Sequence, residues 1–103
     1  MSITLEIGTK NYLDDLLCIK KHLSHMESLL NCYASYTLSE PSSKLGWTFF
    51  KLEFKSNLQI SISKKFSDIL GKYQLNDEVG KFTKFMNDYF IARGCNVRVT
   101  SVT

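Results

Sequence analysis

The segment from Trp47 to Phe54 constrains the fold most, because it carries the clearest strand pattern in the sequence. Its side chains alternate between two faces, one holding Thr48, Phe50, Leu52 and Phe54 and the other holding Trp47, Phe49, Lys51 and Glu53. Alternation with a period of two predicts a half-buried strand. We therefore expect a sheet that packs helices on one face and presents Trp47 and Phe49 on the other.

Further strand and helix patterns surround this segment. Alternating apolar residues predict strands at Ser2 to Ile7, Leu58 to Ile62 and Asn96 to Val102, and the β-prone residues of Tyr33 to Leu38 predict another. The pair Ser56-Asn57 predicts a tight antiparallel hairpin between the central strand and Leu58 to Ile62, because Asn tolerates positive φ. Helical spacing predicts helices from Tyr12 to near Asn31, from Ser63 to Gly71 and from Asn76 to Gly94. Residues 39–43 are expected to form a loop.

The predicted order is β-α-β-β-β-α-α-β, with strands clustered in the middle of the chain. This order favours the α+β class, with an antiparallel sheet of four to five strands and helices packed on one face. The chain has 103 residues, 44% of them hydrophobic, and one proline. A chain of this length and composition buries one core, so we expect a single domain spanning residues 1–103.

The N-terminus and the cysteines indicate the compartment in which the protein works. The first residues lack the basic and apolar regions of a secretory signal, and no apolar run approaches the ~18 residues of a membrane span. Cys18, Cys32 and Cys95 are odd in number and contain no CxxC pair, which is not typical of a disulfide framework. These features predict a cytoplasmic protein with reduced cysteines.

Charge is unevenly divided along the chain. Residues 1–43 hold three Lys or Arg against five Asp or Glu, whereas residues 44–103 hold ten against five. The basic residues are scattered over several predicted elements, whereas phosphate-binding domains usually gather them on one stripe. Nucleic-acid binding through the basic half is therefore the alternative and not the leading hypothesis.

One group of residues has ligand types that zinc prefers. Cys18, His22 and His25 fall at positions i, i+4 and i+7 of the first predicted helix, which places their side chains on neighbouring parts of its surface. No second motif supplies further ligands at a familiar spacing. We therefore expect boundary packing rather than a metal site. The Cys18-His22 pair is also the single local candidate for a cysteine nucleophile, and it lacks an orienting third group.

Other patterns that could carry chemistry have structural explanations. The acidic pairs Asp14-Asp15 and Asp77-Glu78 lie at predicted helix N-termini, where the helix dipole favours negative charge. The five glycines are isolated and form no phosphate-binding loop. Residues 63–90 faintly suggest a helix-turn-helix, but the aromatic side chains of the second helix indicate core packing. We therefore expect no enzyme activity and no cofactor.

The remaining candidate site is a surface. Large aromatics on an otherwise polar sheet face are typical of interface anchors, so we expect a protein partner to contact Trp47, Phe49, Lys51 and Glu53. The competing interpretation is that a helix or the Glu40 to Leu45 loop covers the two aromatics. A second candidate surface is the acidic half, represented by Asp14, Asp15 and Glu40.

In size and composition the chain resembles the small immunity, antitoxin and inhibitor proteins of bacteria and their phages. The resemblance implies a cytoplasmic domain that binds and blocks a toxin or nuclease. The chain departs from that pattern because inhibitors of basic nucleases tend to be acidic, whereas this chain has a net charge of +3. The departure implies either an acidic partner surface or binding through the acidic half.

Overall fold

The long pairing of two central strands, β1 and β4, sets the register of the sheet. The computed structural model describes residues 3–102, with β1 (Ile3–Thr9), α1 (Tyr12–Leu30), β2 (Tyr36–Leu38), β3 (Ser42–Lys44), β4 (Trp47–Phe54), α2 (Ser56–Lys65), α3 (Ser67–Leu70), α4 (Glu78–Ala92) and β5 (Val97–Ser101). The sheet order is β2-β4-β1-β5, all neighbours are antiparallel, and β3 pairs with the first residues of β4. The predicted α+β class with one antiparallel sheet is confirmed. Ser2, the first residue of the first predicted strand, lies outside the described residues.

The two halves of the chain are interleaved in this sheet. Strands β1 and β2 are parallel to each other with β4 between them, and β4 and β5 are parallel with β1 between them. Helix α1 connects the first of these pairs, and the helical segment ending in α4 connects the second. This is the split βαβ arrangement. It brings residues near both ends of the sequence next to the Trp47 end of β4.

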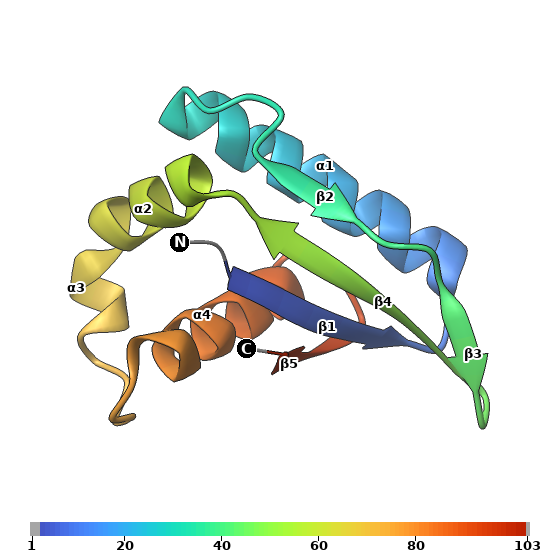
Figure 1. Ribbon diagram of the computed structural model, residues 1–103. Coiled ribbons are helices and arrows are strands. Elements are labelled where there is room, and N and C mark those ends of the chain that lie inside the picture. The colour runs from blue at the N-terminus through green and yellow to red at the C-terminus, as the bar shows by residue number, and fades with distance from the viewer. Residues whose placement is uncertain (1–2, 103) are drawn as a thin grey trace.

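The helices pack on one face of the sheet, as the sequence predicts. In Figure 1 the strands pass in front of α1 and α4. One buried cluster joins the inward side chains of the strands to those of the helices, including Leu5, Ile7, Phe50, Leu52 and Phe54 from the strands and Ile19, Leu23, Leu58, Phe82 and Phe90 from the helices. The aromatic face of α4 is thus core, and the helix-turn-helix interpretation is not supported.

The predicted hairpin after Phe54 is wrong. Ser56–Lys65 forms α2, and the short predicted helix around Ile69 is separated from it at Phe66. Leu58 and Ile62 are fully buried while Ile60 is 48% exposed, so burial follows helical spacing rather than alternation. Leu58 to Ile62 fits both periods because it is short. As a helix, this segment places both Leu58 and Ile62 in the common core.

A tight hairpin does exist, at the other end of β4. Strands β3 and β4 are antiparallel neighbours, and Lys44 and Trp47 are the paired residues nearest the turn. Leu45 and Gly46 form the two-residue connection, with φ of 54° and 82°. Two consecutive positive φ values are typical of the type I′ turns that match strand twist. Ser42 and Ser43, which the sequence assigned to a loop, therefore belong to an edge strand beside Trp47.

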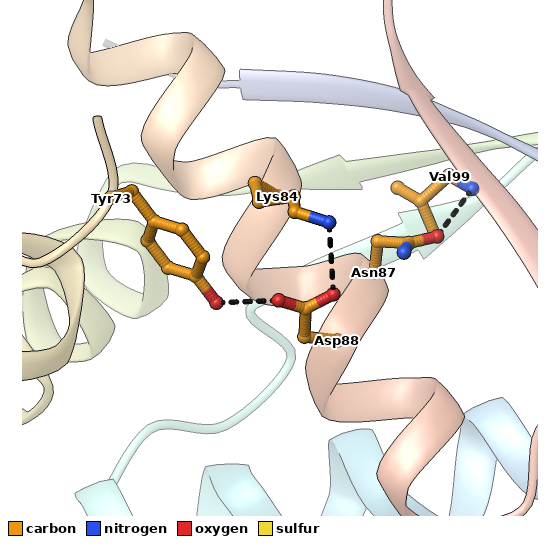
Figure 2. Close-up of polar contacts among 5 residues, drawn as sticks. All are labelled: Tyr73, Lys84, Asn87, Asp88 and Val99. Carbon is orange, nitrogen blue, oxygen red and sulfur yellow. Dashed lines mark hydrogen bonds and ion pairs between the residues drawn. The ribbon is translucent and has the colours of Figure 1, made fainter. Parts of the chain in front are cut away.

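A polar cluster holds the segment between α3 and α4 onto the outer surface of α4. The Tyr73 hydroxyl donates a hydrogen bond of 2.8 Å to the Asp88 carboxylate, and Lys84 lies 3.4 Å from the other carboxylate oxygen (Figure 2). On the same helix, the Asn87 side-chain oxygen accepts a hydrogen bond from the backbone N–H of Val99. These contacts tie α4 to its preceding loop and to β5.

The Tyr73–Asp88 hydrogen bond predicts an unusual titration. Burial, and then the hydrogen bond to Asp88 and its negative charge, raise the pKa of Tyr73 from 10.0 to about 12. A raised pKa means that the folded state favours the neutral phenol, so this stabilisation is present below pH 10.0 and is lost as the pH rises through about 12. We expect the Asp88→Asn variant to bring the pKa of Tyr73 back toward 10.0, measured by tyrosinate absorbance against Tyr73→Phe. An unchanged alkaline titration in Asp88→Asn would contradict this contact.

Among residues 3–102, no helix combines the length and the apolar character needed to cross a bilayer.

Candidate functional site

The open face of the sheet carries the predicted aromatic pair. In the register of the sheet, Ile7 pairs with Phe50 on the core side, and Gly8 pairs with Phe49 on the opposite side. Trp47 and Phe49 are partly exposed, whereas Phe50 is buried. Strand β3, which includes half of the predicted covering loop, lies beside β4 in the sheet rather than over it. The predicted facing of the strand is confirmed.

Gly8 on β1 allows the two rings to lie over the sheet. A Cβ atom at Gly8 would come within 3.0 Å of the Phe49 ring and 3.5 Å of the Trp47 ring. The two rings are stacked, with centroids 6.4 Å apart and planes 21° apart. Any side chain at position 8 would therefore push the Phe49 ring outward. The absence of a side chain at Gly8 leaves room for both rings beside β1.

Two cations complete the cluster around Trp47. Lys10 Nζ lies 5.0 Å and Arg98 Cζ lies 5.1 Å from the centroid of the Trp47 ring. These distances are within the range of cation–π attraction. Arg98 reaches the ring because β5 pairs with β1 so that Arg98 stands opposite Gly8. We refer to Trp47, Phe49, Lys10 and Arg98 as the aromatic–cation cluster.

Acidic and basic side chains share the rest of this face. Glu6 stands opposite Lys51 in the β1–β4 register, and Glu53 stands opposite Thr37, whose hydroxyl lies 3.3 Å from its carboxylate. A shallow hollow beside the aromatic–cation cluster is lined by Glu6, Gly8, Trp47, Phe49, Arg98 and Thr100. The face thus combines an aromatic centre with charges of both signs. Predicted site residues Lys51 and Glu53 lie on it together with Trp47 and Phe49.

The acidic candidates from the N-terminal half do not form one exposed group. Asp15 is only 6% exposed, and its carboxylate accepts hydrogen bonds from the Thr9 hydroxyl and from the backbone N–H of Asn96. Asp14 is exposed and accepts a hydrogen bond from the Asn11 side chain, and Glu40 lies in the exposed connection between β2 and β3. Asp15 therefore joins β1, α1 and the segment before β5, and it cannot serve as a partner contact.

The structure pairs two cysteines that the sequence analysis treated as free. Cys18 on α1 and Cys95 before β5 form a disulfide with a Cα–Cα distance of 5.8 Å, whereas Cys32 is free and buried. No local pattern indicates this pair, because the two residues are 77 positions apart and only the folded chain brings them together. The prediction of reduced cysteines is therefore wrong for Cys18 and Cys95, and these two residues no longer indicate a reducing compartment.

The histidine next to this pair lies at the molecular surface. The ligand atoms of Cys18, His22 and Cys95 all lie within 4.8 Å of one another. Burial lowers the pKa of His22, and the positive charges of Lys21, Arg93 and His25 lower it further against a hydrogen bond to the Arg93 backbone. His25, the third residue of the predicted cluster, lines a hollow with Lys21, His22 and Arg93.

Sequence reasoning missed three members of the open-face site. Gly8 lies near the end of β1 and Lys10 comes just after it, whereas Arg98 lies between two buried valines of β5. Their proximity to Trp47 depends on the order of the strands in the sheet. Comparisons with protein-family models, with curated proteins and with solved structures find no match. The site must therefore be interpreted from its own geometry.

Proposed function

We propose that this chain is a binding protein that docks a partner protein on the open face of its sheet. The observation that carries the proposal is the aromatic–cation cluster. In it, Trp47 stacks on Phe49, and two cationic side chains approach the Trp47 ring, on a face that no helix of residues 3–102 encloses. Tryptophan and arginine are the residues most enriched among interface hot spots. Their clustering beside a hollow gives a partner side chain a place to insert.

The chemistry of this face defines the partner that fits it. Lys10 and Arg98 are favourably placed for carboxylates on the partner, and the rings of Trp47 and Phe49 suit an apolar or aromatic side chain. A partner with an acidic rim around an apolar centre would satisfy both requirements, because complementary charges steer association and fix orientation. This agrees with the acidic partner surface expected for a basic chain.

A finer form of the proposal is that binding blocks the partner. An inhibitor of a toxin or nuclease, of the immunity or antitoxin type, acts by occupying a surface and needs no catalytic residues of its own. A cytoplasmic location and a non-catalytic role belong to this form. It is tested by measuring the partner's own activity at increasing ratios of this chain, with full inhibition expected at one chain per partner.

Single-stranded nucleic acid is the alternative occupant of the same face. Bases stack on aromatic side chains, and phosphates bind Lys and Arg. The aromatic–cation cluster has both features. However, Glu6 borders the hollow and Glu53 lies farther along the same face, where both would repel a phosphate backbone. The mixed charge of the face therefore favours a protein.

The Trp47→Ala variant tests the proposal. It removes the centre of the cluster but no core side chain, so we expect affinity for the partner to fall by about 2 kcal/mol or more, roughly 30-fold, with a small change in stability. The partner is first captured from the source organism on immobilised protein and must bind at a one-to-one ratio. Affinity is then measured by calorimetry. Tyr33→Ala is the matched control, because Tyr33 is 72% exposed and lies between α1 and β2.

Two further outcomes separate the candidate occupants. The Arg98→Glu variant should weaken the binding of an acidic partner, whereas Lys64→Glu on α2 should leave that binding unchanged. Capture that is lost after nuclease treatment, together with Trp47-dependent binding of a fluorescent single-stranded oligonucleotide, would replace the protein partner with nucleic acid. Equal partner affinity for wild type and Trp47→Ala would show that the open face is not the binding surface.

A further inference from the structure

The cluster of Cys18, His22 and Cys95 shares no residue with the aromatic–cation cluster and has no role in the proposed partner binding. Cys18 and His22 are one turn apart on α1, and Cys95 belongs to the turn between α4 and β5. We propose that, when the disulfide is reduced, these three residues bind one thiophilic divalent cation, with zinc as the probe. The ion would join α1 to the beginning of β5.

The positions of the three ligands fit the size of a zinc site. Zn–S bonds are about 2.3 Å and Zn–N bonds about 2.0–2.1 Å, so ligand atoms around a tetrahedral zinc are roughly 3.3–3.8 Å apart. The sulfur and nitrogen atoms here all lie within 4.8 Å of one another. Reduction lets the two sulfurs separate from bonding distance, and small side-chain rotations then suffice. The Cα–Cα distance of 5.8 Å between the cysteines needs no backbone change.

The backbone around the ligands is already fixed. Gly94 has a φ of 86° and turns the chain after α4, and the backbone N–H of Cys95 donates a hydrogen bond to the Phe90 carbonyl. Cys95 is 1% exposed. His22 hydrogen-bonds the backbone of Arg93, and a backbone partner of this kind orients the ring of a ligating histidine. The three ligands are therefore held before any ion arrives.

Charge makes the site depend on both sulfurs. Lys21 and Arg93 line the hollow beside His22 together with His25, and their positive charges oppose a bare divalent ion. Two thiolates neutralise the ion, whereas a disulfide contributes no charge. Metal and disulfide therefore exclude each other.

Reduction is carried out with a water-soluble phosphine, which does not compete strongly for zinc. The disulfide accepts two electrons and two protons to give two thiols, and the phosphine takes an oxygen atom from water to become its oxide. Zinc binding then releases the thiol protons. Zinc is titrated into reduced and oxidised protein in competition with a chromogenic chelator, and cobalt is used in parallel to detect thiolate-to-metal charge transfer.

We expect one zinc per reduced chain and none at stoichiometric level in the oxidised chain. Cys18→Ser should weaken binding more than about 100-fold and His22→Ala more than about 10-fold, since even outer-shell changes cost about 10–100-fold. Cys32→Ala is the matched control and should bind as wild type. Circular dichroism of each reduced variant checks that the fold is retained.

Three results would overturn the proposal. These are no stoichiometric zinc on the reduced, folded chain, equal binding by the His22→Ala variant, or equal loss in Cys32→Ala. Because partner binding depends on Trp47 and zinc binding depends on Cys18, each proposal can fail without the other.

Discussion

Replacing Phe50 with alanine is expected to cost about 3–5 kcal/mol of unfolding free energy, the range for large core aromatics. Phe50 is 2% exposed, and its ring contacts that of Tyr12 edge-to-face with centroids 5.5 Å apart. Truncation leaves a cavity between β4 and α1 that neighbouring side chains fill incompletely. Urea unfolding, followed by circular dichroism, measures the loss.

Phe49→Ala is the matched control for this experiment. It removes the same side chain from the adjacent position of β4, but on the open face, where Phe49 is only partly buried. We expect a loss of about 1 kcal/mol, typical of a partly exposed site. If Phe49→Ala were as destabilising as Phe50→Ala, the two faces of β4 would be wrongly assigned.

The second large effect is expected at Asp15. Asp15→Ala removes the acceptor for the Thr9 hydroxyl and for the Asn96 N–H, and Thr9 is itself fully buried. Leaving the buried Thr9 hydroxyl without a partner costs about 1–3 kcal/mol, and the partly buried N–H of Asn96 adds about 1 kcal/mol. We therefore expect a total loss of about 2–4 kcal/mol, measured by the same unfolding experiment.

The Asp14→Ala variant distinguishes the hydrogen bonds of Asp15 from the effect of a negative charge near the N-terminus of α1. Both carboxylates lie in the first turn of α1, so the dipole favours both, but Asp14 is exposed and contacts only the Asn11 side chain among the described hydrogen bonds. Its loss should cost about 0.5 kcal/mol. Similar losses in the two variants would mean that Asp15 acts through the dipole alone.

These paired variants also show what sequence could and could not predict. The facing of Phe49 and Phe50 follows from alternation over a long strand, which local pattern specifies well. The different roles of Asp14 and Asp15 do not, because Asp15 is distinguished by Thr9 and Asn96. The second of these partners is 81 residues away, and no local pattern encodes such a distance.

The misassigned segment at Leu58 to Ile62 has a different cause. Apolar side chains at every second position over five residues fit a strand, but the first and last of these residues also lie one helical turn apart. Packing against the core decides between strand and helix, because Leu58 and Ile62 are fully buried and Ile60 is not. Tertiary packing here overrides the β propensity of isoleucine.

The candidate sites were predictable to different extents. Trp47 and Phe49 could be placed on the open face from their own strand, but Gly8, Lys10 and Arg98 required the order of the strands. Likewise, the spacing of Cys18 and His22 was visible, whereas Cys95 entered the cluster only through the turn before β5. In each case the missing residues come from another strand or turn, brought near by the antiparallel pairing of β1 with β4 and with β5.

The interleaved sheet has a consequence for how the chain folds. Ile7 pairs with Phe50 on one side and with Val99 on the other, so both partners of β1 are distant in sequence. Closing such long loops costs entropy before any contact is gained, and folding slows as contacts become less local. During synthesis β1 emerges before either partner. The strand at the centre of the finished sheet is thus exposed along both edges until β4 and then β5 arrive.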